Sequence, residues 1–275
     1  MYSGATIRPL TGKMLGAHQK IDRLARAGLR DLIIDNDTFP TTKLILHFEG
    51  VNGPDALKRK SPAKDEPWHF YSPFDETDNR LVETIGEHYD NLVQALKSRD
   101  EVRAAFEAAW LAHAIVDGLT PAHHYPYEEK LAEIRGGENR DSRDTLKGKL
   151  IMPGDNGLEM LVNNWKMWGP RGLINAHGVF EWGVAVMMAP LYEKRVALKK
   201  EDIAELNQHG VLDLFRMRAK EIAAHGVYES YMKHGWTPSL ARLVRKKVVP
   251  VIVRMVTLSW YAAAVDAGLA KKTAL

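Results

Sequence analysis

Residues 101–124 read EVRAAFEAAWLAHAIVDGLTPAHH, and the expected class of fold follows from this stretch. Apolar residues recur in it at helical spacing, so residues 101–118 are expected to form one helix of high apolarity. Asp100 provides a start signal just before this helix, and Gly118 and Pro121 end it. A helix of this kind is typical of the interior of an all-α protein.

The same stretch carries polar residues that a core helix does not need. His113 and Asp117 are four residues apart, so their side chains leave one face of the helix about one turn apart. His123 and His124 follow soon after the helix ends. The pattern therefore indicates a chemical role in addition to packing.

Helical periodicity also dominates the rest of the chain, and strand-like alternation is scarce. The expected helices span residues 14–35, 76–98, 101–118, 127–135, 156–167, 171–193, 201–224 and 238–270. Two segments, 48–75 and 136–156, are rich in glycine, proline and charge, and the second is expected to be a surface excursion. Neither separates two independent apolar cores, so we predict an all-α fold with a single compact multi-helix domain over residues 1–275.

The composition limits the kinds of ligand and metal site that we expect. Of the 275 residues, 45% are apolar and 27% are charged, as in a soluble globular protein. The net charge of +3 weakly favours anionic ligands such as phosphate esters, and it is too small to predict a stable nucleic-acid partner. Because the chain has no cysteine, disulfides and zinc–thiolate sites are excluded, and any metal must be held by His, Asp and Glu.

The ends of the chain bear on its location. The N-terminal residues lack an apolar run after a basic start, which predicts a cytoplasmic protein without a signal peptide. A secreted protein whose signal peptide has been removed is the alternative. The most apolar stretch, 248–270, contains Pro250, Arg254 and Asp266, so we expect a buried core helix there and no transmembrane segment.

Two histidine–carboxylate pairs have the spacing of metal ligands. His113 and Asp117 form the first, and His177 and Glu181 form the second, each at i and i+4 on an apolar helix. Such a pair is often a plain surface ion pair. A carboxylate among apolar residues is costly to bury without a cation, however, so two pairs together with His123 favour a metal site.

The sequence leaves the role of several other residues undecided. In the irregular segment, Asp55 and His69 are further ligand candidates, and His18 begins an amphipathic helix. Each of these alone is more typical of a helix cap or of the surface. Several aromatic residues either line a cleft or pack beside a loop, namely Trp68, Phe70, Tyr71, Tyr125 and Tyr127. We expect Trp165 and Trp168 to pack in the core and His88 to lie at the surface.

Taken in order, these residues resemble the ligand series of the zinc-dependent phospholipase C / P1 nuclease family. The series comprises His18, Asp55, His69, His113-x3-Asp117-x5-His123 and His177-x3-Glu181. The HFY sequence around His69, the interval of fourteen residues from Asp55 to His69, and a Glu at position 181 resemble the phospholipase C branch. The resemblance implies an all-helical fold with a cluster of zinc ions in a cleft.

The resemblance also implies how the ligands are shared. One zinc ion would bind Asp55, His69, His113 and Asp117, and a second would bind His123, His177 and Glu181. Family members with a third ion hold it with an N-terminal Trp, a His that matches His18 and the bridging Asp that matches Asp117. This chain begins with Met, and it has a longer interval between His123 and His177 than the phospholipase. His124 competes with His123 as a ligand, and the spacing favours His123.

The implied function is that of a zinc-dependent phosphoric ester hydrolase similar to phospholipase C. Two zinc ions, with a third where His18 also serves, would activate a water that attacks phosphorus. Asp55 would act as the catalytic general base. The substrate would be a phosphate-ester small molecule or a phospholipid headgroup. The alternatives are a 3′-nucleotidase or single-strand nuclease on the same scaffold, or a non-catalytic metal-binding helical protein.

Overall fold

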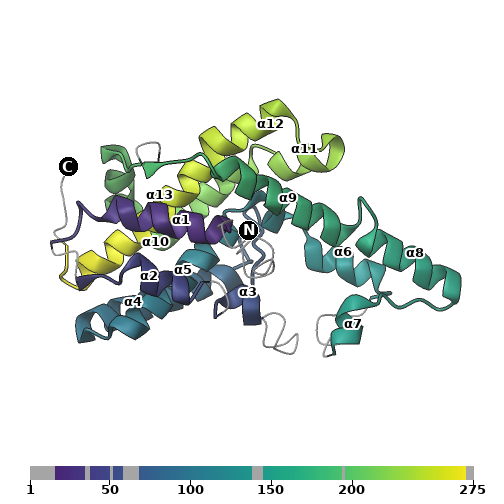
Figure 1. The fold of residues 1–275 in the computed structure, drawn as a ribbon, viewed down its shortest axis with the longest axis horizontal. Helices are drawn as coiled ribbons and strands as arrows, with labels where there is room; N and C mark the ends of the chain where they lie inside the picture. Colours follow the sequence, from purple (N-terminus) through teal and green to yellow (C-terminus); the bar gives the residue numbers. More distant parts are fainter. Residues whose placement is uncertain are drawn as a thin grey trace.

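Helix α5 (Glu101–Gly118) lies within a bundle of helices (Figure 1). The structure is a computed structural model that describes residues 16–34, 38–49, 52–57, 68–137, 145–193 and 196–270. α4 (Arg80–Ser98) reverses into α5 through Arg99, which has a left-handed backbone with φ 58°. The Asp100 side chain then accepts a hydrogen bond of 2.9 Å from the Arg103 N–H and caps the new helix. From position 107 onward α5 is buried except at Trp110, which is partly buried.

The C-terminal helix completes the core. α13 (Val249–Asp266) packs against α5, α4, α1 (Ala17–Leu29) and α10 (Lys200–Ala223). It continues from α12 (Pro238–Leu243) through a π-helical turn. The continuous helix Pro238–Asp266 is long and apolar enough to cross a membrane, but 78% of its most apolar part is buried inside the protein. Its apolarity is thus that of a core helix.

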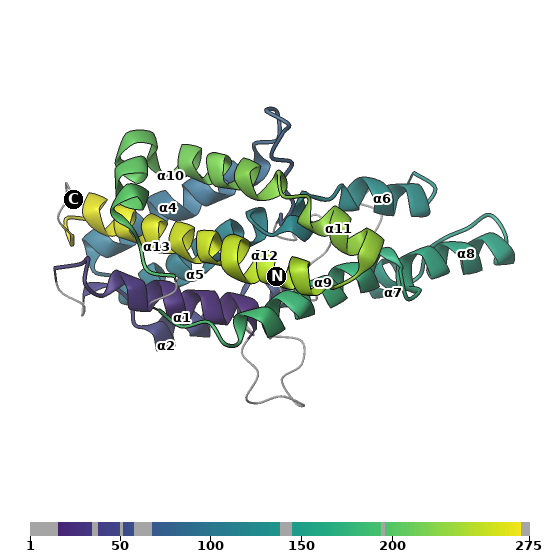
Figure 2. The ribbon, with the colours of Figure 1, turned by 90° about the horizontal axis from the view of Figure 1, so that it is seen from above.

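A smaller arm extends from one end of the bundle (Figures 1 and 2). It contains α6 (Tyr127–Ile134), α7 (Leu146–Leu150) and α8 (Gly157–Trp168). A minor apolar cluster holds it together, made of Leu131, Met152, Met167 and Leu173. α9 (Leu173–Met188) runs from this arm back to the bundle, so one helix belongs to both parts.

The predicted fold class is confirmed: the structure is all-α, and no strand occurs in the described ranges. Each predicted helix is present, although several ends differ and residues 14, 15 and 35 lie outside the described residues. The helix expected from residue 76 begins at Arg80, because the Asp75 side chain accepts hydrogen bonds from Thr77 and closes a local turn instead. Gly210, with φ 74°, interrupts α10.

Short helices were not predicted. They are α2 (Thr42–His47), α3 (Pro54–Leu57), α7 and α11 (Val227–His234). All have eight residues or fewer, a length at which periodicity is a weak signal. α3 lies in the segment 48–75 that we expected to be irregular, and it carries Asp55.

The predictions for Trp165 and for His88 were wrong. Trp165 is 68% exposed, because the apolar residues of α8 face solvent, opposite the face that packs on the arm. Trp168 is partly buried, and its indole N–H donates to the Leu150 carbonyl at 2.8 Å. His88 is not a free surface residue, since its Nδ1 lies 2.6 Å from Oε2 of the fully buried Glu107.

Candidate metal centre

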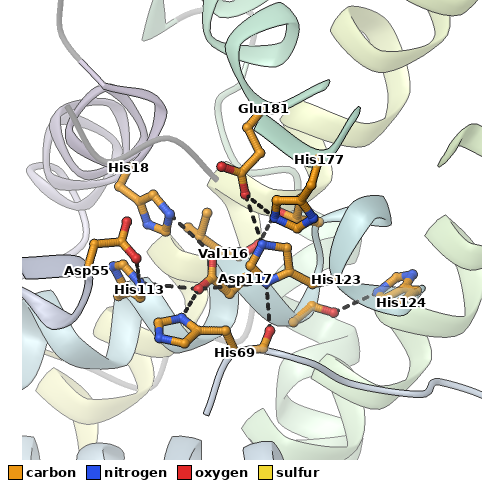
Figure 3. Close-up of polar contacts among 12 residues, drawn as sticks. His18, Asp55, His69, His113, Val116, Asp117, His123, His124, His177 and Glu181 are labelled. Atoms are coloured by element: carbon orange, nitrogen blue, oxygen red, sulfur yellow. Dashed lines mark hydrogen bonds and ion pairs between the residues drawn. The ribbon is translucent and has the colours of Figure 1, made fainter. Parts of the chain in front are cut away.

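Asp117 is the centre of a cluster of histidines beneath the N-terminal end of α1 (Figure 3). Its side chain is 1% exposed. Nε2 of His18 lies 3.3 Å from Oδ1, and Nε2 of His113 lies 3.2 Å from Oδ2. His69 Nδ1 makes a short contact with Oδ2, and His123 Nδ1 lies 3.8 Å from the same oxygen. One buried carboxylate thus faces four imidazole rings.

Two sets of ligand-type residues surround this point. The core group consists of His18, Asp55, His69, His113 and Asp117. The outer group consists of His123, His177 and Glu181. Within each of three triplets, one ligand atom per residue lies within 4.8 Å of the others: His18–His113–Asp117, Asp55–His69–His113 and His123–His177–Glu181. All eight residues predicted as metal ligands are therefore brought together.

The core group draws on four separate parts of the chain. His113 and Asp117 come from α5, His18 comes from α1, and Asp55 comes from α3. His69 lies in the extended segment just before α4. Asp55 Oδ1 lies 3.7 Å from His113 Nε2, and the Asp55 side chain is 21% exposed while that of His113 is 2% exposed. Asp55 therefore marks the side of the core group that solvent reaches.

The residues of the outer group come from the turn that follows α5 and from α9. His123 lies on the short 3-10 helix η3 (Pro121–His124), and His177 and Glu181 are one turn apart on α9. Nε2 of His123 and Nε2 of His177 each lie 3.0 Å from the same oxygen, Glu181 Oε1. The three side chains thus converge on one point from two elements.

The end of α5 places His123 between the two groups. The Thr120 hydroxyl donates to the Val116 carbonyl at 2.6 Å, and the His123 N–H donates to the Thr120 carbonyl at 2.8 Å, so the chain turns tightly. Gly118 is needed here for space, because a Cβ would lie 2.5 Å from the Phe215 ring. Its role is thus close packing as well as the predicted helix end.

His124 belongs to neither group. Its Nε2 lies 2.8 Å from the Gly118 carbonyl and donates to it, and in Figure 3 the ring points away from Asp117. Burial lowers the pKa of His124 to about 4, so the ring is neutral at physiological pH. Between the two adjacent histidines, the geometry brings His123 alone to the cluster, as the spacing predicted.

The pKa values of Asp117 and Glu181 are lowered, which favours their ionised forms. Burial alone would raise the pKa of Asp117, but His123 and His113 hold it well below its usual value. Burial acts in the same way on Glu181, whose pKa is nevertheless held well below its usual value by His177 and His123. Buried negative charge of this kind requires a positive partner.

The pKa values of the histidines are shifted in two opposite directions. Burial lowers the pKa of His18 and of His123 below the usual histidine value. Burial would also lower the pKa of His113, but the carboxylates of Glu49, Asp117 and Asp55 raise it well above its usual value. A cation that binds His113 must therefore displace a proton.

Several buried atoms fit a metal ion. Among the described residues, no hydrogen-bond partner exists for either ring nitrogen of His18, for His113 Nε2 or for His177 Nδ1. His123 Nδ1 donates to the His69 carbonyl at 2.7 Å, so a neutral His123 ring would turn the lone pair of Nε2 toward the Glu181 carboxylate. Two acceptors that face each other at 3.0 Å are unfavourable unless a cation lies between them. The nitrogen and oxygen donors are those that zinc accepts.

Spacing did not identify every residue of the site. Glu49 is fully buried, and its Oε1 lies 2.9 Å from His113 Nδ1. Of the aromatic residues, Phe70 stacks on His123 with ring centroids 5.4 Å apart, and Tyr127 stacks on Phe70 at 5.2 Å. Tyr71, in contrast, is 4% exposed and packs in the core.

Trp68 and Tyr125 are partly buried against the same core. Met1, which stands where the resemblance would require an N-terminal Trp ligand, lies outside the described residues. Comparison of the chain with protein-family models, with curated proteins and with solved structures found no match.

Proposed function

We propose that this protein is a zinc-dependent phosphodiester hydrolase of the phospholipase C type. The observation that carries the proposal is the adjacency of the core and outer groups. His123 links them, since its Nδ1 lies 3.8 Å from Asp117 and its Nε2 lies 3.0 Å from Glu181. Adjacent pairs of divalent ions are common in enzymes that hydrolyse phosphate esters.

The proposed ligand sets follow the two groups. Asp55, His69, His113 and Asp117 would hold one zinc ion, and the outer group would hold a second. His18 also faces Asp117, at 3.3 Å, so a third ion has ligands in this half of the site. Bound divalent ions supply Lewis-acid chemistry, because they lower the pKa of water and neutralise phosphate oxygens.

The side chains on the solvent-exposed side of the site have different proposed roles. Asp55 is the proposed proton acceptor, because its carboxylate belongs to the core group and is still 21% exposed. In hydrolysis it would take the proton of the water whose oxygen bonds to phosphorus, while the ester P–O bond breaks and the alkoxide leaves. Phe70 and Tyr127 form a stacked pair beside His123, which would limit water on that side.

The proposed substrate is a small phosphate ester or a phospholipid headgroup. Support comes from a carboxylate-rich site suited to divalent cations and from a net charge of +3, which is mild. A nuclease that binds long nucleic acid would need a more basic surface. A 3′-nucleotidase and a non-catalytic metal-binding protein are the alternatives that the experiment must separate.

The test combines metal content with a substrate panel. The protein would be purified from zinc-supplemented medium, and zinc per chain would be measured together with hydrolysis of a phosphocholine ester, a simple phosphodiester and a 3′-nucleotide. We expect at least two zinc ions and preferential cleavage of the phosphocholine ester. Asp55→Asn should abolish the activity, whereas Asp90→Asn, the same change at an exposed position of α4, should not alter it.

Each alternative has its own outcome. Faster cleavage of the 3′-nucleotide would favour the nucleotidase. Bound zinc without hydrolysis of any ester would indicate a non-catalytic metal-binding protein. A folded protein that contains no zinc would overturn the proposal.

A further inference from the structure

Two stacked imidazoles lie between two buried carboxylates. The rings of His18 and His113 are 4.1 Å apart and 15° from parallel. Both turn Nε2 toward Asp117, at 3.3 and 3.2 Å. Both turn Nδ1 toward Oε1 of Glu49, at 3.6 Å for His18 and 2.9 Å for His113. Glu49 thus faces the same two rings as Asp117, from the opposite edge.

Glu49 is held firmly in this place. It follows α2, which packs against α5, and the residue is 0% exposed. Gly53 makes a close approach to its backbone, since a Cβ there would lie 1.7 Å from the Glu49 carbonyl oxygen. Gly53 is therefore packed closely against the backbone of Glu49. A larger residue at position 53 would displace Glu49.

Burial of the Glu49 carboxylate costs free energy unless its contacts with the two imidazole rings offset that cost. Among the described residues, Glu49 Oε2 has no hydrogen-bond partner, so Oε1 makes the contacts that hold the side chain. Asp22, one turn after His18 on α1, is also buried. Burial and the neighbouring Glu49 raise the pKa of Asp22 well above its usual value. A carboxylate oxygen is an acceptor for an imidazole N–H, and Glu49 Oε1 lies 2.9 Å from His113 Nδ1.

Once a cation has displaced the second proton of His113, an imidazole that donates Nδ1–H offers its lone pair at Nε2. For His113, Nε2 is the atom that faces both Asp55 and Asp117. The hydrogen bond to Glu49 thus selects the tautomer that the core group needs. Carboxylates behind metal-binding histidines act in this way in many metal sites.

We propose that Glu49 is a positioning residue of the core group, which sets the tautomer and orientation of His113 and, more weakly, of His18. It lies on the edge of the rings opposite the ligand atoms, so it acts through them. This inference rests on the metal site of the proposed function but not on the reaction. It predicts that Glu49 affects metal affinity in the core group and leaves the outer group unchanged.

The experiment uses a graded pair of variants and a matched control. Glu49→Met removes the acceptor at similar size, and Glu49→Gln keeps a neutral carbonyl acceptor. Glu107→Met is the control, because Glu107 is also 0% exposed and also contacts a histidine Nδ1, at 2.6 Å, away from the metal groups. Zinc affinity would be measured by competition with a chelator, and the histidine tautomers by ¹⁵N NMR of the ring nitrogens.

We expect Glu49→Met to weaken the core-group zinc by about 10- to 100-fold, with Glu49→Gln between it and the wild type. Zinc bound by the outer group should keep its affinity, and Glu107→Met should lower stability without changing either affinity. In the zinc-loaded wild type, His113 should carry its proton on Nδ1.

Unchanged core-group affinity in Glu49→Met would overturn the inference, and so would a His113 proton on Nε2. Should Glu49→Met fail to fold, Glu49→Gln and the wild-type tautomer decide the matter. Zinc binding that depends on Glu49, in a protein that hydrolyses no phosphodiester, would refute the proposed function and leave this inference standing.

Discussion

The core group and the outer group use the same residue types but are supported differently. Four of the five core residues are nearly inaccessible, and they come from elements that pack in the main core. In the outer group, His177 and Glu181 are each 15% exposed, and both lie on α9. Metal binding in the core group should therefore be coupled to the stability of the whole fold, whereas the outer group depends on the position of one helix.

Helices α5 and α9 explain this difference. α5 is covered on nearly all sides from position 107 onward, so His113 and Asp117 cannot move without the core. Most residues of α9 are apolar, yet Val179, Trp182 and Val186 are about half exposed, on the side away from His177 and Glu181. An apolar helix that is packed on only one side has fewer contacts to fix its position.

The largest effect should come from Asp117→Asn, which tests whether the two groups are truly separate. The change keeps the size of the side chain but removes the charge that faces four histidines. We expect the core group to lose zinc affinity by more than about 100-fold, since Asp117 is a direct ligand in the proposal. Metal analysis and chelator competition would measure this loss.

Asp117→Asn should also weaken the outer group slightly, because the substituted side chain lies 3.8 Å from His123 Nδ1. The control is Asp155→Asn, the same change at an exposed position before α8. Full zinc content in Asp117→Asn would contradict the assignment of the core group.

A smaller and more local effect is expected from Glu181→Gln. Glu181 Oε1 is the shared contact of His123 and His177, so its loss should release the outer zinc and leave the core zinc in place. The free energy of unfolding of the zinc-free protein should change by about 1 kcal/mol or less, because the side chain is partly exposed. Zinc per chain and denaturant unfolding would be measured in parallel.

Glu159→Gln, an exposed change on α8, is the matched control for Glu181→Gln. If Glu181→Gln released all bound zinc, the two groups would be a single cooperative site. That result would remove the distinction between core and outer support.

Much of the site could be predicted because its ligands are local pairs. The spacing of His113 and Asp117, and of His177 and Glu181, places each pair on one helix face by geometry alone. Glu49 could not be predicted in this way, because it lies 64 residues from His113 and meets it only through the packing of α2 on α5. The sequence also could not indicate that Trp165 faces solvent, since an apolar stripe predicts burial whether or not a partner is present.

The smallest effect concerns His124, which lies beside the outer group but outside it. Burial places its pKa at about 4 in the folded protein, against 6.5 for the unfolded chain. Because the folded pKa is lowered, the unfolded state binds the proton more readily, and stability present above pH 6.5 is lost as the pH falls toward 4. His124→Gln, which can still donate to the Gly118 carbonyl, should remove this dependence.

Between about pH 7 and about pH 5, we expect the zinc-free wild type to lose roughly 2 kcal/mol of stability relative to His124→Gln. Urea unfolding of both proteins at each pH would measure the difference, in which the titration of the ligand histidines largely cancels. An equal loss in both proteins would place the titration elsewhere, and the leading source would then be His123. A stability difference of the expected size would instead establish that His124 contributes to the fold. His123 would then be the one of the two adjacent histidines that links the core and outer groups.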